Sequence, residues 1–330
     1  MLAVLAVSML LAASCSSDSD EATVTVYSGR TENLIGPILE EFAAETGINV
    51  AVNYGESSDL ALLITEEGEQ TRADVFLSQS PGAVEFLDRQ GLLSILPDEI
   101  LELVPTTVQD DAGHWIGFSG RQRVLVYNQE LVDPAELPNS VFDLTGDRWR
   151  GQLGVAPSNG SFQDFVTSMR GLVGDDDTLA WLGGLSDNDV QTYPNNNAIV
   201  AAVGRGEIEV GLVNHYYNYR FLAEDPSHPG VNHQFAIDDP GSLLIVTGAA
   251  LVAGSENTEA AEQLITWLLG ESAQRFFADE TFEYPLVPGI EPAAGVPSAE
   301  FSAVGGIDFG DLGDGLEGTR SLITDAGLDG

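Results

Sequence analysis

Three tyrosines stand within four positions in the segment VNHYYNYRF, residues 213–221. A phenol has a pKa of about 10, so ionising one at pH 7 costs about 4 kcal/mol. A bound metal ion offsets such a cost, and hard anionic oxygen ligands suit a hard ion such as Fe(III). Tyr216 and Tyr217 are therefore candidate ligands of a ferric ion, whereas Tyr219, on another face, is expected to pack. The alternative is that all three rings pack and hydrogen-bond at a domain edge.

The elements around the tyrosines favour a ligand site. Residues 207–213 (EIEVGLV) predict a buried strand, and residues 215–224 predict a helix that Asn214 begins as N-cap. Two consecutive side chains in a first turn can converge on a ligand beyond the helix end. The positive end of the helix dipole favours anionic oxygen at that point.

The rest of the chain alternates between strand and helix patterns. Residues 23–91 predict βαβ units and a parallel, doubly wound sheet, and a second α/β set covers 151–224. The long extended stretch 115–128 is of the kind that crosses between lobes, and α/β structure is expected again over 243–278. Ligands of open α/β sheets bind at the carboxyl ends of strands, beside helix N-termini. The Gly/Asp-rich tail at 305–318 is expected to be a surface turn, and SHPGVNH (227–233) a loop.

Composition excludes several functions. The chain has 330 residues, with 52 acidic and 12 basic ones, and every basic residue is arginine. Without lysine there is no Walker-A loop, Schiff-base nucleophile or kinase lysine. A net charge of −40 makes nucleic acid a poor partner. No G-x-S-x-G, HExxH or paired-cysteine motif points to an enzyme.

The N-terminus has the pattern of an export signal. Residues 2–13 are almost wholly apolar but too few to span a membrane, and LAASC resembles the lipobox of bacterial lipoproteins. The resemblance implies a signal peptide over 1–14, lipidation of Cys15 and a flexible tether over 15–22. The protein would then be exported and held by a lipid anchor on the outer face of the cytoplasmic membrane or in the periplasm. The alternative is a plain signal with an incidental cysteine.

Several segments occur in an order that is similar to the ferric-ion-binding proteins of bacterial ABC iron importers. They are VTVYSGRTENLIGPILEEFAAETGINV, RADVFLSQ, SGRQRVLVYN, NNNAIVAAVGRGEIEVGLVNHYYNYR, VTGAALV and EYPL, from about residue 23 to 290. The resemblance implies a two-lobe α/β periplasmic-binding-protein (flytrap) fold with ligand in the interlobe cleft. The lobes are expected at 23–121 plus 246–285 and at 122–245 plus 286–330. It also implies a monomeric receptor rather than an enzyme, which passes Fe(III) to an ABC permease and its ATPase.

The resemblance carries the ferric ligands to Tyr216 and Tyr217 but not the auxiliary ligands. Family members place a histidine, a glutamate or a third tyrosine at positions that here hold Thr31, Gln79 and Asn159. Exogenous anions and water then complete the shell, or another side chain substitutes. The candidate substitutes are Glu32, Glu56 and His215.

The anion half of the site is better preserved. The segment PSNGSFQD places four residues at a helix N-terminus, where backbone N–H groups bind anions: Ser158, Asn159, Gly160 and Ser161. In the family, a synergistic carbonate (bicarbonate) or phosphate bridges metal and protein near here. The resemblance assigns Arg30, Arg121, Asn196 and Asn214 to that anion, the alternative for each being a surface arginine or capping asparagine. Arg123 is expected to form a structural ion pair.

Two other functions remain open from the sequence. A receptor of the same fold for an oxyanion or small organic solute is compatible with the missing auxiliary ligands. A hydrolase or sensor of this fold has no motif to support it. Fold alone does not choose among them.

Overall fold

The computed structural model describes residues 22–298 and 310–328. The predicted signal peptide, Cys15 and all of the predicted tether except Ala22 therefore lie outside the described residues. Within the described part of the chain, no helix is both long and apolar enough to span a membrane.

One mixed sheet runs through both lobes in the order β2-β1-β3-β9-β4-β7-β5-β6. In the first lobe β1 (Thr23–Ser28) pairs in parallel with β2 (Asn49–Tyr54) and β3 (Val75–Ser78), as the βαβ pattern predicts. The parallel order holds for these three strands, and the sheet becomes mixed beyond them, because β9 (Leu244–Leu251) lies antiparallel between β3 and β4. All eight residues of β9 are buried, so its continuous apolar pattern gave no sign of direction.

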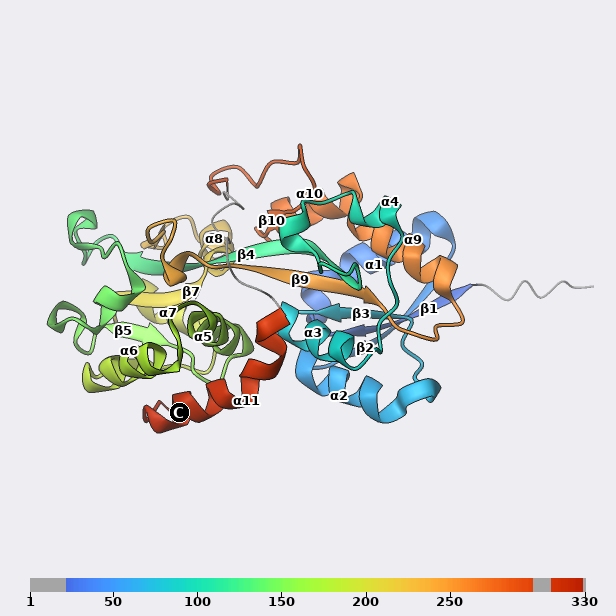
Figure 1. Cartoon of the computed structure of the whole chain (residues 1–330). Coiled ribbons are helices and arrows are strands. Elements are labelled where there is room, and N and C mark those ends of the chain that lie inside the picture. The colour runs from blue at the N-terminus through green and yellow to red at the C-terminus, as the bar shows by residue number, and fades with distance from the viewer. Residues whose placement is uncertain (1–21, 299–309, 329–330) are drawn as a thin grey trace, which may run out of the picture.

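Strand β4 (Trp115–Asn128) joins the two lobes, as its length predicts. Its first half, to Gln122, pairs with β9, and its second half, from Arg123, pairs with β7 (Val210–Asn214) and β8 (Gly230–His233). Figure 1 shows β4 and β9 side by side where the sheet passes from one lobe to the other. The expectation of a loop at 227–233 is wrong for its last four residues, which form β8 on this strand.

The remaining strands are short. In the second lobe β5 (Leu153–Val155) pairs in parallel with β6 (Gln191–Thr192) and β7, and in the first lobe β10 (Tyr284–Pro285) pairs with β4. The 3-10 segments are Gly68–Gln70, Thr106–Val108, Pro134–Glu136, Val141–Thr145, Asp147–Trp149 and Pro240–Ser242.

Helices cover both lobes. Those of the first lobe are α1 (Glu32–Thr46), α2 (Ser57–Glu67), α3 (Pro81–Arg89), α4 (Asp98–Leu101), α9 (Thr258–Leu268) and α10 (Glu271–Asp279). Those of the second are α5 (Gly160–Val173), α6 (Asp175–Asp187), α7 (Asn196–Gly204) and α8 (His215–Glu224). Gly47 ends α1 with φ 73°, and its N–H donates to the Ala43 carbonyl, the C′ role that the sequence predicts.

Buried apolar side chains form a separate core in each lobe. One cluster contains β1, β3, β9 and the start of β4, and the second lobe holds two clusters on opposite faces of its sheet. Core residues between 286 and 296, which the sequence analysis assigns to lobe 2, pack in the first cluster. The lobe boundaries stay a prediction, and we propose that residues 286–298 belong to lobe 1.

The expectation of a surface turn at 305–318 is wrong where the chain is described, because Gly310–Asp325 forms helix α11. This helix contacts α5 and α6 of the second lobe and α3 of the first (Figure 1). A Cβ at Gly315 would lie 2.5 Å from Cγ2 of Thr167, and the hydroxyls of Thr167 and Thr319 are 2.7 Å apart. The glycines that indicate a turn in sequence thus permit close helix–helix approach.

Candidate metal and anion site

The tyrosine segment has the predicted geometry. Strand β7 ends at Asn214, whose extended backbone (φ −81°, ψ 143°) makes it the N-cap of α8. The Asn214 side chain does not cap the helix. Its Oδ1 is buried and has no hydrogen-bond partner among the described residues. An amide oxygen at the mouth of a helix N-terminus therefore remains available to a ligand.

The rings of Tyr216 and Tyr217 stack with centroids 4.2 Å apart in the first turn of α8. Tyr216 is fully buried, and its hydroxyl has no hydrogen-bond partner within the described part of the chain. Burial raises the pKa of Tyr216 well above its ordinary value. The charges of Tyr217 and Glu283 act the same way, as does the nearby Tyr217 hydroxyl, which is not aligned for a hydrogen bond, whereas Arg121 opposes them. A buried phenol without a partner is costly in the protein alone. Such a cost is typical of a position kept for a ligand.

Tyr219 points elsewhere, as the sequence predicts. Its ring stacks on Phe282 at 6.2 Å between centroids and packs against the core of the first lobe. It therefore serves as a matched comparison for the other two tyrosines, since all three lie on one helix.

Two buried arginines occupy the point where β4 changes lobes. Arg121 donates to the carbonyl of Gln79 in the first lobe, and Arg123 donates to the carbonyl of Ser161 in the second. Both side chains are fully buried, and the Nε and Nη1 of each have no partner among the residues described. Burial and the charge of Arg121 lower the pKa of Arg123 to about 9. Two buried cations with free N–H groups favour an anion beside them.

The expected ion pair of Arg123 is not present among the described residues; its guanidinium lies over the Phe165 ring, 5.2 Å from the centroid.

The polar cradle forms at two helix N-termini. Asn159 caps α5, and its Oδ1 accepts from the backbone N–H of Ser161 at 3.2 Å. Asn196, at the start of α7, donates to Oδ1 of Asn159 and to Oγ of Ser161. Ser158 and Gly160 are exposed beside them. The structure thus brings Asn159, Ser161 and Asn196 together. The hydrogen bond from Arg123 to the Ser161 carbonyl places this group beside the arginine pair, Arg121 and Arg123.

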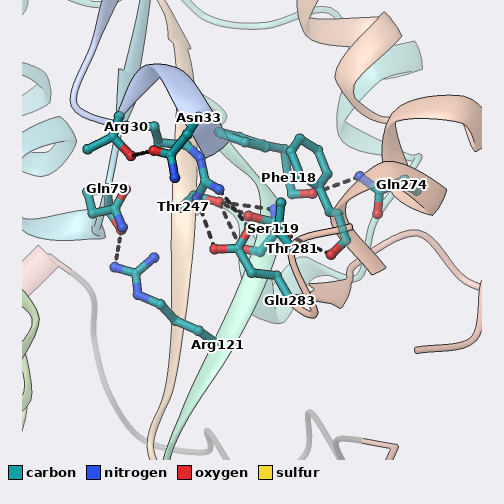
Figure 2. A network of polar contacts seen from close by, with 12 residues as sticks. Arg30, Asn33, Gln79, Phe118, Ser119, Arg121, Thr247, Gln274, Thr281 and Glu283 are labelled. Carbon is teal, nitrogen blue, oxygen red and sulfur yellow. Dashed lines mark hydrogen bonds and ion pairs between the residues drawn. The ribbon is translucent and has the colours of Figure 1, made fainter. Parts of the chain in front are cut away.

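Arg30 lies in a different environment from the other two arginines. Its Nη1 and Nη2 donate to Oε1 and Oε2 of Glu283 at 3.1 and 2.8 Å, and both side chains are completely buried (Figure 2). Burial acts to raise the pKa of Glu283, but the charge and hydrogen bonds of Arg30, together with the charge of Arg121 and the hydroxyl of Thr281, hold it below its ordinary value. The role of Arg30 in anion binding stays a prediction, and the structure shows its two terminal nitrogens occupied by a carboxylate.

The candidate auxiliary ligands differ in their burial and in their distance from the arginines. Thr31, Glu32 and Glu56 are exposed near the N-termini of α1 and α2. Gln79 lies closer to the arginines, and its buried Oε1 has no partner in the described part of the chain. His215 is buried, accepts from the N–H of Gln122 at 3.1 Å and stacks on Tyr284. Burial lowers the pKa of His215 to about 4, so its ring is neutral at pH 7.

Sequence reasoning missed two carboxylates of this region. Glu283 appears in the sequence only as part of EYPL, and its partner Arg30 is 253 residues away. Asp164 on α5 accepts a hydrogen bond from Ser80 of the first lobe. Burial raises the pKa of Asp164, against that hydrogen bond and the charges of Arg121 and Arg123. No local pattern could have found them, because both contacts depend on the folded arrangement of distant segments.

Two other features lie away from the tyrosines. A hollow of about 430 Å³ beside α7 and α8 is lined by Arg205, Phe221, Asp225 and His228, among others, and includes none of the candidate ligands. His114 lies 2.7 Å from an Asp88 carboxylate oxygen, and Asp110 completes that group. The contact between His114 and Asp88 has the geometry of an ordinary ion pair.

The sequence matches the family model for bacterial extracellular solute-binding proteins over residues 70–305. It is 31% identical over 294 residues to the Fe(3+)-binding periplasmic protein of Serratia marcescens, covering 87% of this chain and 86% of the relative. It is 32% identical over 299 residues to the major ferric iron-binding protein of Neisseria meningitidis, covering 86% and 88%.

Among solved structures, iron-bound HitA from Pseudomonas aeruginosa superposes with a TM-score of 0.85 at 33% identity. The superposition covers 93% of this chain and all of HitA. The predicted two-lobe fold is thereby confirmed.

Proposed function

Because this chain belongs to the bacterial extracellular solute-binding protein family, we propose that it is the receptor of an ABC importer for Fe(III). Tyr216 and Tyr217 bind the ferric ion as phenolates, and a synergistic carbonate or phosphate binds beside it. The observation that carries the proposal is the stacked tyrosine pair at the N-terminus of α8, in which Tyr216 is buried and Tyr217 half-buried, with an unpartnered Tyr216 hydroxyl next to two arginines with free N–H groups. The similarity to the ferric-binding proteins of Serratia marcescens and Neisseria meningitidis supports it.

Charge balance supports the inclusion of an anion. Fe(III) with two phenolates carries one positive charge. Arg121 and Arg123, counted with the carboxylate of Asp164, add another, because Arg30 and Glu283 cancel each other. A dianion such as carbonate or hydrogen phosphate neutralises the sum, and burial makes such neutrality favourable. The arginine N–H groups and the cradle at α5 and α7 supply donors for its oxygens.

The burial of Tyr216, Arg121 and Arg123 also indicates how Fe(III) reaches the site. Tyr216, Arg121 and Arg123 have no exposed surface, and Asp164 of one lobe contacts Ser80 of the other. Fe(III) therefore enters when the lobes move apart, and the closed form is what the permease receives. The strand β4, which both lobes share, is where such a hinge motion is expected.

The remaining parts of the proposal follow from the family and from the N-terminal sequence. The chain is a monomeric binding protein rather than an enzyme, it is exported and anchored through lipidated Cys15, and it delivers iron to a permease with its cytoplasmic ATPase. Labelling with a radioactive fatty acid, with Cys15→Ser as control, tests the anchor.

Visible spectroscopy tests the ferric site. Fe(III) added with hydrogencarbonate to the purified chain should produce a phenolate-to-iron absorption band at one ion per chain. Tyr216→Phe and Tyr217→Phe should abolish or strongly weaken the band, while Tyr219→Phe on the same helix should preserve it. Absence of a band in the wild type with carbonate, phosphate and citrate alike would sink the ferric proposal.

An anion receptor is the second candidate, favoured by the free N–H groups of Arg121 and Arg123. It would be supported if oxyanions raise the melting temperature, Arg123→Gln removes that effect, and Fe(III) gives no band.

A further inference from the structure

The segment that carries Glu283 is held in a strained backbone conformation. Phe282 has φ 60°, a left-handed value that a bulky residue adopts only when its surroundings impose it. The N–H of Glu283 donates to the carbonyl of Phe277 at 2.9 Å, and the hydroxyl of Thr281 lies between the carbonyl of Phe277, at 2.7 Å, and Oε2 of Glu283, at 3.2 Å. Strain of this kind clusters at functional sites, and here it directs a carboxylate into the interior.

The same segment contacts both halves of the candidate site. Glu283 holds Arg30 with two hydrogen bonds, as Figure 2 shows, and the next residue, Tyr284, stacks on His215 at 4.2 Å between centroids. His215 directly precedes the tyrosine pair. Three consecutive residues, 282–284, therefore contact the first lobe at Arg30 and the tyrosine helix at His215 and Tyr219.

The three buried arginines differ in which of their guanidinium nitrogens lack a hydrogen-bond partner among the described residues. Arg121 and Arg123 each keep Nε and Nη1 without a partner among the described residues, whereas Arg30 keeps only Nε. Arg30 donates to both oxygens of the Glu283 carboxylate, and the Thr281 hydroxyl lies 3.2 Å from one of them, so the pair is well satisfied. Arg30 thus has neither the free fork nor the uncompensated charge that an oxyanion needs.

We propose that Glu283 is a positioning and specificity-determining residue of the anion site. It holds the Arg30 guanidinium, cancels its charge and leaves Arg121 and Arg123 as the two cations that meet the anion. This role rests on the function proposed above, and it deepens that function by assigning the site a dianion rather than a trianion. Removing the negative charge of Glu283 would give the site a third cation.

Phosphate binding to the iron-free protein tests the proposal. Glu283→Gln keeps the shape of the side chain and removes its charge, so it should tighten phosphate binding on the order of tenfold, the size expected for one added charge at short range. The measurement is the melting temperature as a function of phosphate concentration, fitted to a dissociation constant. Glu85→Gln, at another buried glutamate of the first lobe, is the matched control and should leave phosphate affinity unchanged.

A double variant keeps the test decisive if Glu283→Gln folds poorly with Arg30 left unpaired. Arg30→Gln/Glu283→Gln removes the whole pair and should bind phosphate within about threefold of the wild type, because neither residue contacts the anion. Citrate should gain more affinity than phosphate from Glu283→Gln, since it carries more charge. A merely structural role predicts weaker binding and no such change in preference.

Three results would overturn the proposal. They are unchanged or weaker phosphate binding by folded Glu283→Gln, a double variant that loses tenfold or more, and a wild type that phosphate does not stabilise. None of these measurements contains iron, so they are separate from the ferric titration that tests the proposed function.

Discussion

Removing the hydroxyl of Tyr216 should stabilise the iron-free protein while it abolishes iron binding. That hydroxyl is fully buried and has no hydrogen-bond partner in the described residues. A buried polar group without a partner costs about 1–3 kcal/mol. Tyr216→Phe recovers that cost and keeps the ring that stacks on Tyr217. We expect a gain of about 1 kcal/mol, or a rise of about 1–2 °C in melting temperature for a chain of this size.

The assay is thermal unfolding of metal-free protein at pH 7, with Tyr284→Phe as control. Tyr284 is equally buried, but its hydroxyl interacts with Gln234, so its removal should cost about 1 kcal/mol. The two variants should shift the melting temperature in opposite directions. A loss of stability in Tyr216→Phe comparable to that in Tyr284→Phe would show that the Tyr216 hydroxyl is satisfied within the protein, and would refute the reasoning.

Three further predictions follow from charge and packing. Two phenols that bind as phenolates each release a proton, so Fe(III) affinity should fall about a hundredfold per pH unit on acidification. The affinity is measured in competition with a chelator of known protonation constants. A tenfold fall per pH unit would indicate a single phenolate. Burial raises the pKa of Glu85 to about 7, although Trp115 donates a hydrogen bond to its carboxyl group. Because this pKa is higher in the folded than in the unfolded protein, the contribution of Glu85 to stability is complete below the unfolded pKa and is lost as pH rises through about 7. Glu85→Gln should therefore gain on the order of 2 kcal/mol over wild type in thermal unfolding at pH 8 and nothing at pH 4; an equal gain at both would contradict the linkage. Gly315→Ala places a Cβ 2.5 Å from Thr167 and should cost about 1–3 kcal/mol in denaturant unfolding, while Gly183→Ala, with nothing within 4 Å, should be neutral or stabilising.

The placement of Tyr216 and Tyr217 at a helix N-terminus could be predicted from sequence because the geometry there is local. A buried strand, an extended Asn214 and a helix that begins at His215 follow directly from residue patterns, and they place two consecutive side chains at one helix end. The helix N-terminus at Asn159 is local in the same way.

Long-range partners could not be predicted. Arg30 has the same charge and a similar sequence context to Arg121, yet Glu283 pairs with the first and leaves the second without a carboxylate partner among the described residues. That difference depends on a segment 253 residues away along the chain. The prediction of a surface turn in the Gly/Asp-rich tail was wrong for a related reason. Tertiary packing against α5 overrides the weak helix propensity of that segment.

The direction of β9 was also beyond reach, since a fully buried strand shows the same apolar pattern whether it lies parallel or antiparallel to its neighbours.

A crystal structure of the Fe(III)-loaded protein, with anomalous scattering measured at the iron edge, tests the central claim most directly. We expect one iron peak bonded to the phenolate oxygens of both Tyr216 and Tyr217, with an anion beside Arg121 and Arg123. An iron peak elsewhere, or one bonded to neither tyrosine, would contradict it.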